Sequence, residues 1–221
     1  DKPDDERKKN KLRVTKCTDA YPQAAKFVVP LDVQKDEDIA AIVEKAKAEF
    51  GQIDFLLHSI AFATLDDLNR DTIATSREGF KLAMEISAYS LLAVCNAAKE
   101  IMSSKSSILT LTYFGGERIV SGYNVMGVCK AALDSCMKYA AFDLGPRGIR
   151  VNALSAGPLK TLAGSAAGVG EMLGLYEKMA PLGRNVTHDE VGRIGREETR
   201  VRGIRRSGWL GVSSYFNSVV A

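Results

Sequence analysis

One segment reads Tyr113-Phe-Gly-Gly-Glu-Arg-Ile-Val-Ser-Gly-Tyr-Asn-Val-Met-Gly-Val-Cys-Lys130 and leads from a predicted strand into a long predicted helix. It places Tyr123 and Lys130 seven positions apart. Because seven residues make about two helical turns, both side chains are expected to lie on one side of the helix. A nearby ammonium group favours the phenolate, so it would lower the pKa of the tyrosine. The pair is a candidate proton donor to a carbonyl oxygen; the alternative is an exposed helix face of no chemical role.

Strands and helices alternate on both sides of this segment. The apolar spacing predicts strands at residues 26–31, 53–57, 108–112 and 149–154, and helices at 36–50, 76–103 (with a capping box at 75–78) and 123–144. This alternation predicts an α/β fold with a doubly wound parallel sheet of the Rossmann-like type. Ligands bind beyond the carboxyl ends of such strands, where four segments converge. They are Asp32, residues 59–63, Tyr113 and residues 157–161.

Composition excludes several classes of protein. The 221 residues are 46% hydrophobic and 26% charged, which suits one globular domain. We expect no membrane partner, because no apolar run reaches the roughly 18 residues of a membrane span, and no signal peptide is visible. Four cysteines without metal spacing predict free thiols in a reducing compartment and no metal. Six arginines between residues 193 and 206 account for the net charge of +3. The rest carries about −1, so no nucleic-acid partner is expected.

Seven short motifs resemble one family. They are Leu31-Asp-Val33, His58-Ser-Ile-Ala-Phe-Ala63, Ile86-Ser-Ala-Tyr-Ser90, Leu109-Thr-Leu-Thr-Tyr113, Tyr123-Asn-Val-Met-Gly-Val-Cys-Lys130, Arg150-Val-Asn-Ala-Leu-Ser-Ala-Gly-Pro158 and Pro181-Leu-Gly-Arg-Asn-Val-Thr187. With them the chain resembles the short-chain dehydrogenase/reductases over roughly residues 26–192, and within these the enoyl-acyl-carrier-protein reductases of fatty acid synthesis. General members carry an Asn-Asn-Ala-Gly type loop in place of His58-Ser-Ile-Ala. They also carry a serine before the catalytic tyrosine, where this subfamily uses a further tyrosine, here Tyr113.

The resemblance implies a reaction and its catalytic residues. NADH, with NADPH not excluded, would reduce the trans-2 double bond of an enoyl thioester carried on acyl carrier protein. Tyr123 would stabilise the enolate, Lys130 would hold the nicotinamide ribose hydroxyls, and Tyr113 would line the pocket near the reacting carbons. Tyr113 as a plain core tyrosine is the alternative.

The resemblance also implies binding residues. Those expected to contact the cofactor, besides Lys130, are Asp32 and Val33 at the adenine, Ser59, Ile60 and Ala61 at the nicotinamide, and Leu159 and Thr161 at the carboxamide and pyrophosphate. Those expected to contact the substrate are Ala63, Tyr113 and Met172, the last on a helix that covers the substrate. Asp32 as a simple turn former is the alternative, and His58 is expected to cap or pack rather than to catalyse.

Two parts of the chain depart from the family pattern. The family begins with a strand, a glycine-containing phosphate loop, a helix and a second strand, which have no counterpart before residue 26. We therefore expect a truncated chain in which the strands ending at Asp32 and Leu57 lack a neighbour between them. After about residue 192, an arginine- and glycine-rich sequence replaces the family's last helix and strand. It resembles a shifted reading frame or intron read-through, and a genuine basic tail is the alternative. We expect a partial reductase domain at 1–192 and a poorly packed basic tail at 193–221.

Three hypotheses follow. The first is an enoyl-acyl-carrier-protein reductase. The second is an inactive fragment that keeps only helix-mediated self-association through residues 76–103 and 123–144. The third is a carbonyl reductase of the same superfamily, which the His58 loop and Tyr113 argue against. The family's tetramers imply a homo-oligomer. Bacterial cytoplasm is the expected location, and a plastid is the alternative because any transit peptide would lie before Asp1.

Overall fold

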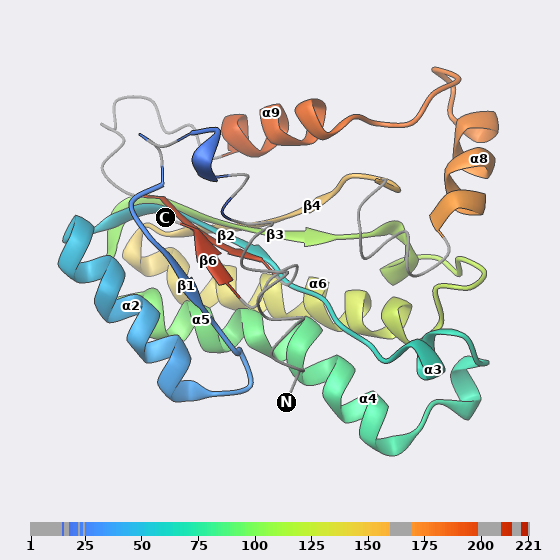
Figure 1. Cartoon of the computed structure of the whole chain (residues 1–221), viewed down its shortest axis with the longest axis horizontal. Coiled ribbons are helices and arrows are strands. Elements are labelled where there is room, and N and C mark those ends of the chain that lie inside the picture. Colours follow the sequence, from blue (N-terminus) through green and yellow to red (C-terminus); the bar gives the residue numbers. More distant parts are fainter. Residues whose placement is uncertain are drawn as a thin grey trace.

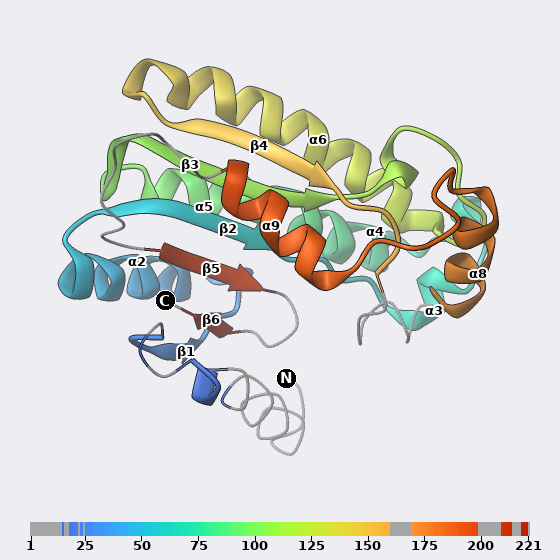
Figure 2. The ribbon, with the colours of Figure 1, turned by 90° about the horizontal axis from the view of Figure 1, so that it is seen from above.

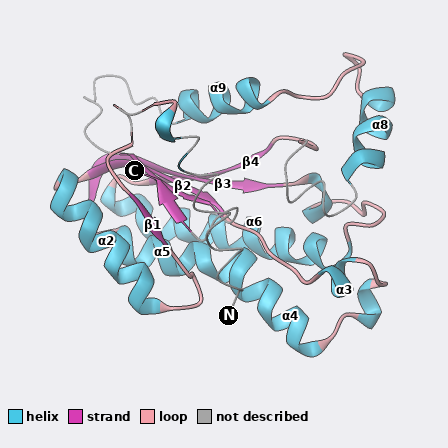
Figure 3. Cartoon of the chain, viewed as in Figure 1, coloured by secondary structure: helices cyan, strands magenta, loops and turns pink. Residues whose placement is uncertain are grey.

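The computed structural model describes residues 15, 18–21, 23, 25–159, 169–198, 209–213 and 218–220. Within these ranges, one sheet separates two unequal helical layers (Figure 1). Helices α2, α4, α5 and α6 cover one face, and α9 lies across the other (Figures 1 and 2). Figure 3 shows that strands and helices follow one another along most of the described chain. The predicted α/β fold with a doubly wound parallel sheet is confirmed.

The sheet has six strands in the order β1-β6-β5-β2-β3-β4. They are β1 (Val28–Pro30), β2 (Ile53–Ser59), β3 (Met102–Thr112), β4 (Arg150–Ser155), β5 (Trp209–Ser213) and β6 (Ser218–Val220). Strands β5, β2, β3 and β4 are parallel, whereas β6 is antiparallel to both of its neighbours. Two predicted strands are longer in the structure, because β2 continues through His58 and Ser59, and β3 starts at Met102.

The structure corrects the expectation that β1 and β2 lack a neighbour. Strand β5 pairs with β2, with Phe55 opposite Trp209, and β6 pairs with β1, with Pro30 opposite Ser218. Two segments of the expected tail therefore lie between β1 and β2, as Figure 2 shows. The physical reason is that unpaired N–H and C=O groups on a strand edge accept an extended segment. The division of the chain at residue 192 stays a prediction.

The helices confirm most of the predicted spacing. They are α2 (Asp36–Phe50), α3 (Leu65–Leu68), η1 (Thr72–Ala74), α4 (Arg77–Met84), η2 (Glu85–Tyr89), α5 (Ser90–Ala98), η3 (Phe114–Gly116), α6 (Asn124–Leu144), η4 (Gly145–Arg147), α8 (Val169–Met179) and α9 (His188–Glu198). The helix predicted at 76–103 ends at Ala98 and contains a π-helical turn, η2. Its N-cap is Ser76, whose Oγ accepts from the Gly79 N–H, rather than the expected Thr75. The Thr75 hydroxyl instead donates to the Thr72 carbonyl at 2.7 Å.

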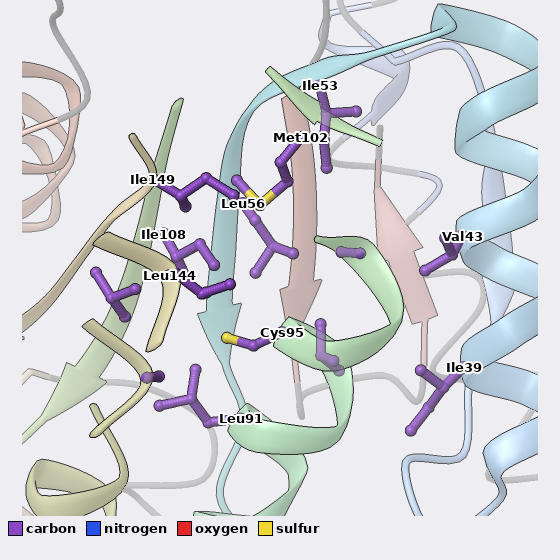
Figure 4. Packing of buried hydrophobic residues seen from close by; sticks show 14 of the residues in the cluster. Ile39, Val43, Ile53, Leu56, Leu91, Cys95, Met102, Ile108, Leu144 and Ile149 are labelled. Carbon is purple, nitrogen blue, oxygen red and sulfur yellow. The ribbon is translucent and has the colours of Figure 1, made fainter. Parts of the chain in front are cut away.

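The main hydrophobic core lies between the sheet and the larger helical layer (Figure 4). Its members include Ile39 and Val43 of α2, Leu91 and Cys95 of α5, Leu144 of α6, Leu56 of β2 and Ile108 of β3. Burying each such side chain contributes about 1.5–3 kcal/mol. This packing fixes α6 across β3 and β4, so that the first residues of α6 lie at the carboxyl ends of the parallel strands.

Candidate active site

The carboxyl ends of the parallel strands meet at one edge of the sheet. Thr112 at the end of β3 is opposite Ser155 at the end of β4, and Ser59 at the end of β2 is opposite Ser213 of β5. The chain leaves these ends through residues 60–63, Tyr113 and residues 156–159. Three of the four segments predicted to converge, residues 59–63, Tyr113 and the described part of 157–161, therefore lie at one edge.

Tyr113 and Tyr123 pack against each other at this edge. Their ring centroids lie 4.8 Å apart, and the ring planes meet at 65° in an edge-to-face arrangement. Such pairs contribute about 0.5–1.5 kcal/mol beyond burial alone. The Tyr113 hydroxyl also donates to Met172 Sδ of α8 at 3.2 Å. Three residues expected to catalyse or to contact substrate are thus in one cluster.

Lys130 is buried on the second turn of α6. Its Nζ donates a hydrogen bond of 2.7 Å to the Leu111 carbonyl of β3. Burial lowers the pKa of Lys130 to about 8, while Asp134 and Cys129 act in the opposite direction. An ammonium group has three N–H donors. Within the described ranges only one of them has a hydrogen-bond partner, so two are available to a ligand.

The structure corrects the expected effect of Lys130 on Tyr123. The pKa of Tyr123 is raised rather than lowered, because burial disfavours the charged phenolate; Tyr113 and Cys129 add to this effect. Burial is the largest cause of this shift, and Lys130 is not among its causes. Tyr123 keeps its proton at neutral pH, which suits a hydrogen-bond donor.

Two glycines after Tyr113 let the turn η3 pack directly on α6. A Cβ on Gly115 would collide with the Tyr123 ring at Cδ1, and a Cβ on Gly116 would lie 2.9 Å from the Ala131 nitrogen. The neighbour of Gly116 is backbone that cannot move aside, so this position requires glycine, whereas a Cβ on Gly115 would displace the Tyr123 ring. The sequence analysis did not predict that these glycines let the chain pack against Tyr123 and α6. The Gly-Gly pair could have indicated a close approach of the backbone to another element.

His58 packs in the protein interior, as expected, and both of its ring nitrogens have hydrogen-bond partners. Its Nδ1 lies 2.9 Å from Thr110 Oγ1, and its Nε2 lies 2.9 Å from Ser90 Oγ. Burial, with a smaller effect of Lys130, lowers the pKa of His58 to about 3. The neutral ring therefore ties β2 to β3 and α5.

The structure places the residues expected to bind the cofactor in different settings. Asp32 forms the turn before α2, since its Oδ1 accepts from the Gln34 N–H at 3.1 Å. Its contact with adenine stays a prediction. Ile60 is buried in the core, so only its backbone is available to a ligand.

The other residues expected to bind cofactor or substrate are also found in the structure, with one exception. Val33 packs against the core, whereas Ala61 and Ala63, like Tyr123, pack against a second hydrophobic cluster. Ser59 and Leu159 are half-buried. Thr161 lies outside the described residues.

A largely apolar cavity of about 650 Å³ adjoins this site. The residues that line it come from the loop after β4, from α8, from α9 and from the connection between these helices. They include Pro158, Tyr176, Leu182, Val186 and Ile194. Tyr176 lines the cavity and also influences the catalytic cluster, because it adds to the effect of burial in raising the pKa of Tyr113. Neither Tyr123 nor Lys130 lines the cavity, so it lies beside the catalytic cluster rather than at its centre.

The described part of the chain offers neither a metal site nor a membrane span. No group of three or more His, Cys, Asp or Glu residues there could hold a metal ion. No helix there has the length and apolar character that crossing a membrane requires.

Comparison with known proteins adds independent information. The family model described as "Enoyl-(Acyl carrier protein) reductase" matches residues 4–195, which extends the expected resemblance toward the N-terminus. "Enoyl-[acyl-carrier-protein] reductase [NADH] FabI" of Bacillus cereus is 50% identical over 182 residues, which cover 81% of this chain and 70% of that protein. "Enoyl-[acyl-carrier-protein] reductase [NADPH] FabI" of Staphylococcus aureus is 46% identical over 190 residues, which cover 85% of this chain and 73% of that protein.

Solved structures agree with these relatives. The Bacillus cereus enoyl-acyl carrier protein reductase, crystallised with NADP+ and an indole naphthyridinone, matches with a TM-score of 0.76 and 46% identity. The match covers 86% of this chain and 74% of that one. The enzyme of Anaplasma phagocytophilum in complex with NAD matches with a TM-score of 0.71 and 36% identity, covering 85% of this chain and 70% of that one.

Proposed function

Because the chain belongs to the enoyl-(acyl carrier protein) reductase family, a branch of the short-chain dehydrogenase/reductases, we propose that it reduces the trans-2 double bond of an enoyl thioester on acyl carrier protein. NADH or NADPH is the reductant, as in its named relatives. The observation that carries the proposal is the edge-to-face pair of Tyr113 and Tyr123 at the carboxyl ends of the strands. The buried Lys130 lies about two helical turns after Tyr123 and bonds to the Leu111 carbonyl near the end of β3.

The residues present fit the nicotinamide end of the cofactor. Lys130 offers two N–H groups that have no partner in the described ranges, and the hydroxyls of a ribose are suitable acceptors. Ser59, the last residue of β2, and Ala61 shortly after it are proposed to contact the nicotinamide ring. When bound, the cofactor supplies a hydride, while the protein supplies orientation and electrostatic stabilisation.

Tyr123 acts on the oxygen of the thioester. Addition of a hydride at C3 moves the electrons of the double bond onto the carbonyl oxygen and gives an enolate. The hydroxyl of Tyr123, which burial keeps protonated, donates a hydrogen bond to that oxygen. A donor in this role typically contributes about 10²- to 10³-fold in rate. A proton from solvent, added at C2, then completes the saturated thioester.

Tyr113 shapes the space beside Tyr123. Its ring holds the Tyr123 ring edge-to-face, and its hydroxyl reaches Met172 of α8. We assign Tyr113, Met172 and Ala63 to the wall that contacts the acyl group near the reacting carbons.

Self-association is also proposed, as a homotetramer built through the larger helical layer. Large hydrophobic side chains are exposed on that layer, including Tyr89 of η2 and Phe142 of α6, at 55% and 80%. Such exposure is typical of surfaces that bind another chain. Light scattering on the purified protein tests this proposal, and a monomer at all concentrations would contradict it.

We place the protein in the bacterial cytoplasm. Cys95, Cys129 and Cys136 are free in the structure, which accords with a reducing compartment.

The enzyme proposal is tested by following NADH oxidation with crotonyl and longer trans-2-enoyl thioesters. We expect saturable NADH binding and substrate-dependent oxidation, with turnover reduced about 10²-fold or more in Tyr123→Phe. Tyr139→Phe is the matched control, because Tyr139 is 70% exposed on the same helix. Absence of both NADH binding and turnover in the unmodified chain would contradict the proposal.

A further inference from the structure

Asn124 has an unusual backbone conformation next to Tyr123. It is the first residue of α6, and its φ of 42° lies in the left-handed region. Residues other than glycine seldom adopt this region, although asparagine tolerates it better than most. Non-glycine residues in the left-handed region cost about 1–3 kcal/mol and persist where the surroundings hold them in place.

The side chain of Asn124 bonds to the end of a distant helix. Its Nδ2 donates to the Leu68 carbonyl at 2.6 Å and to the Arg70 carbonyl at 2.8 Å. Both hydrogens of the amide are therefore used. The two carbonyls lie at the end of α3, where the backbone acceptors of a helix otherwise lack partners. Asn124 thus joins the start of α6 to the segment that follows α3.

Further hydrogen bonds, at Phe62 and Asp67, join the α3 segment (residues 60–70) to neighbouring parts of the chain. Asp67 is buried, and its carboxylate accepts from the Thr64 hydroxyl at 2.8 Å and from the Ser76 N–H at 2.8 Å. The Ser87 hydroxyl of η2 accepts from the Phe62 N–H at 2.9 Å and donates to the Phe62 carbonyl at 3.1 Å. The segment is therefore a fixed point against which α6 can be placed.

The same segment packs against the hydrophobic cluster on which Tyr123 also packs. Ala61, Ala63 and Leu68 belong to the hydrophobic cluster that also contains Tyr123 and Val125. Ala61 and Ala63 are the residues assigned above to the nicotinamide and to the acyl group. The start of α6 and the α3 segment therefore share one hydrophobic cluster, and the Asn124 amide also joins them by hydrogen bonds. The α3 segment contains the residues proposed to contact the cofactor and the substrate.

We propose that Asn124 is a positioning residue for the reduction: its amide locks the α3 segment to α6 and so sets the distance between the Tyr123 hydroxyl and the thioester oxygen. This inference rests on the proposed function. The hydrogen bond from Tyr123 is needed at the enolate oxygen, and a displacement of about 1 Å can cost about 10²-fold in rate. Loss of the lock should therefore lower kcat more than it weakens cofactor binding or folding.

Two substitutions separate the hydrogen bonds from the backbone conformation. Asn124→Gly removes the amide but accepts a positive φ without strain, whereas Asn124→Ala removes the amide and keeps the strain. We expect kcat to fall about 10-fold or more in both variants, since each loses the lock. The KM for NADH should change less than about 3-fold. Asn96→Ala is the matched control, because Asn96 is exposed on α5 and its side-chain oxygen accepts from the neighbouring Lys99.

A second measurement does not depend on turnover. Hydrogen exchange of the amides in the α3 segment should be faster in both Asn124 variants, while exchange in β3 is unchanged. The inference is overturned if Asn124→Gly keeps kcat within about 2-fold of the unmodified chain, or if exchange in the α3 segment is unaltered. It is also overturned if kcat falls only in proportion to the fraction of folded protein. An unmodified chain without turnover would refute the proposed function, and hydrogen exchange would then still decide whether the lock exists.

Discussion

Replacing Lys130 by methionine should change how stability depends on pH. Lys130 is buried, and its pKa is lowered from the ordinary 10.5 to about 8. At about 1.4 kcal/mol for each tenfold change in proton concentration, keeping this lysine charged costs the folded state about 3 kcal/mol. Lys130→Met removes the charge while keeping most of the volume and the apolar stem.

The sign follows from proton binding. As pH rises through about 8, the folded protein loses the Lys130 proton, while the unfolded chain keeps it until about 10.5. The unfolded state then binds more protons, so the free energy of unfolding contributed by this group increases across that interval. Below the interval both states are charged, and the full cost is present. The unmodified protein should therefore gain about 3 kcal/mol relative to Lys130→Met between about pH 7 and about pH 11.

Urea denaturation followed by circular dichroism at several pH values measures this difference. Lys138→Met is the matched control, because Lys138 is exposed on the same helix. Its stability should follow that of the unmodified protein at every pH. Parallel curves for the unmodified protein and Lys130→Met would refute the reasoning, because they would show that Lys130 is hydrated or paired in the folded state.

Three further substitutions test the packing around the site. Gly115→Ala should lower kcat about 10-fold or more, because the added methyl group would displace the Tyr123 ring; the control Gly192→Ala in α9, where nothing lies within 4 Å, should leave kcat unchanged. Gly79→Ala should lower the free energy of unfolding by about 1–3 kcal/mol, since its Cβ would overlap the Asp67 carboxylate; an unchanged urea midpoint would contradict this. Tyr113→Phe keeps the edge-to-face ring contact and loses only the hydrogen bond to Met172, so kcat should fall less than in Tyr113→Ala.

Local patterns in the sequence predicted much of the fold. The apolar spacing gave α2 and α6 within one residue, because both helices bury one face against the sheet. The same reasoning ended β2 too early, since His58 is polar but is buried between two hydroxyl groups. Strands β5 and β6 were not predicted, because their pairing with β2 and β1 is decided by distant chain segments.

The candidate site was predictable only in part. The motif identified Tyr113, Tyr123 and Lys130, which the structure brings to one edge of the sheet. The direction of the Tyr123 pKa shift was wrong because burial, which determines it, is not visible in sequence spacing. Asn124 lies inside the same motif, but its partners are more than fifty positions away, so nothing local indicated its role.

Isotope transfer tests the central claim most directly. The purified chain would be supplied with NADH carrying deuterium at both C4 positions and with a trans-2-enoyl thioester in ordinary water. Mass spectrometry and NMR of the product would locate the label. We predict one deuterium at C3, none at C2, and loss of this product in Tyr123→Phe. Deuterium on the carbonyl carbon, or equal turnover by Tyr123→Phe, would contradict the assignment of this chain as an enoyl thioester reductase acting through Tyr123.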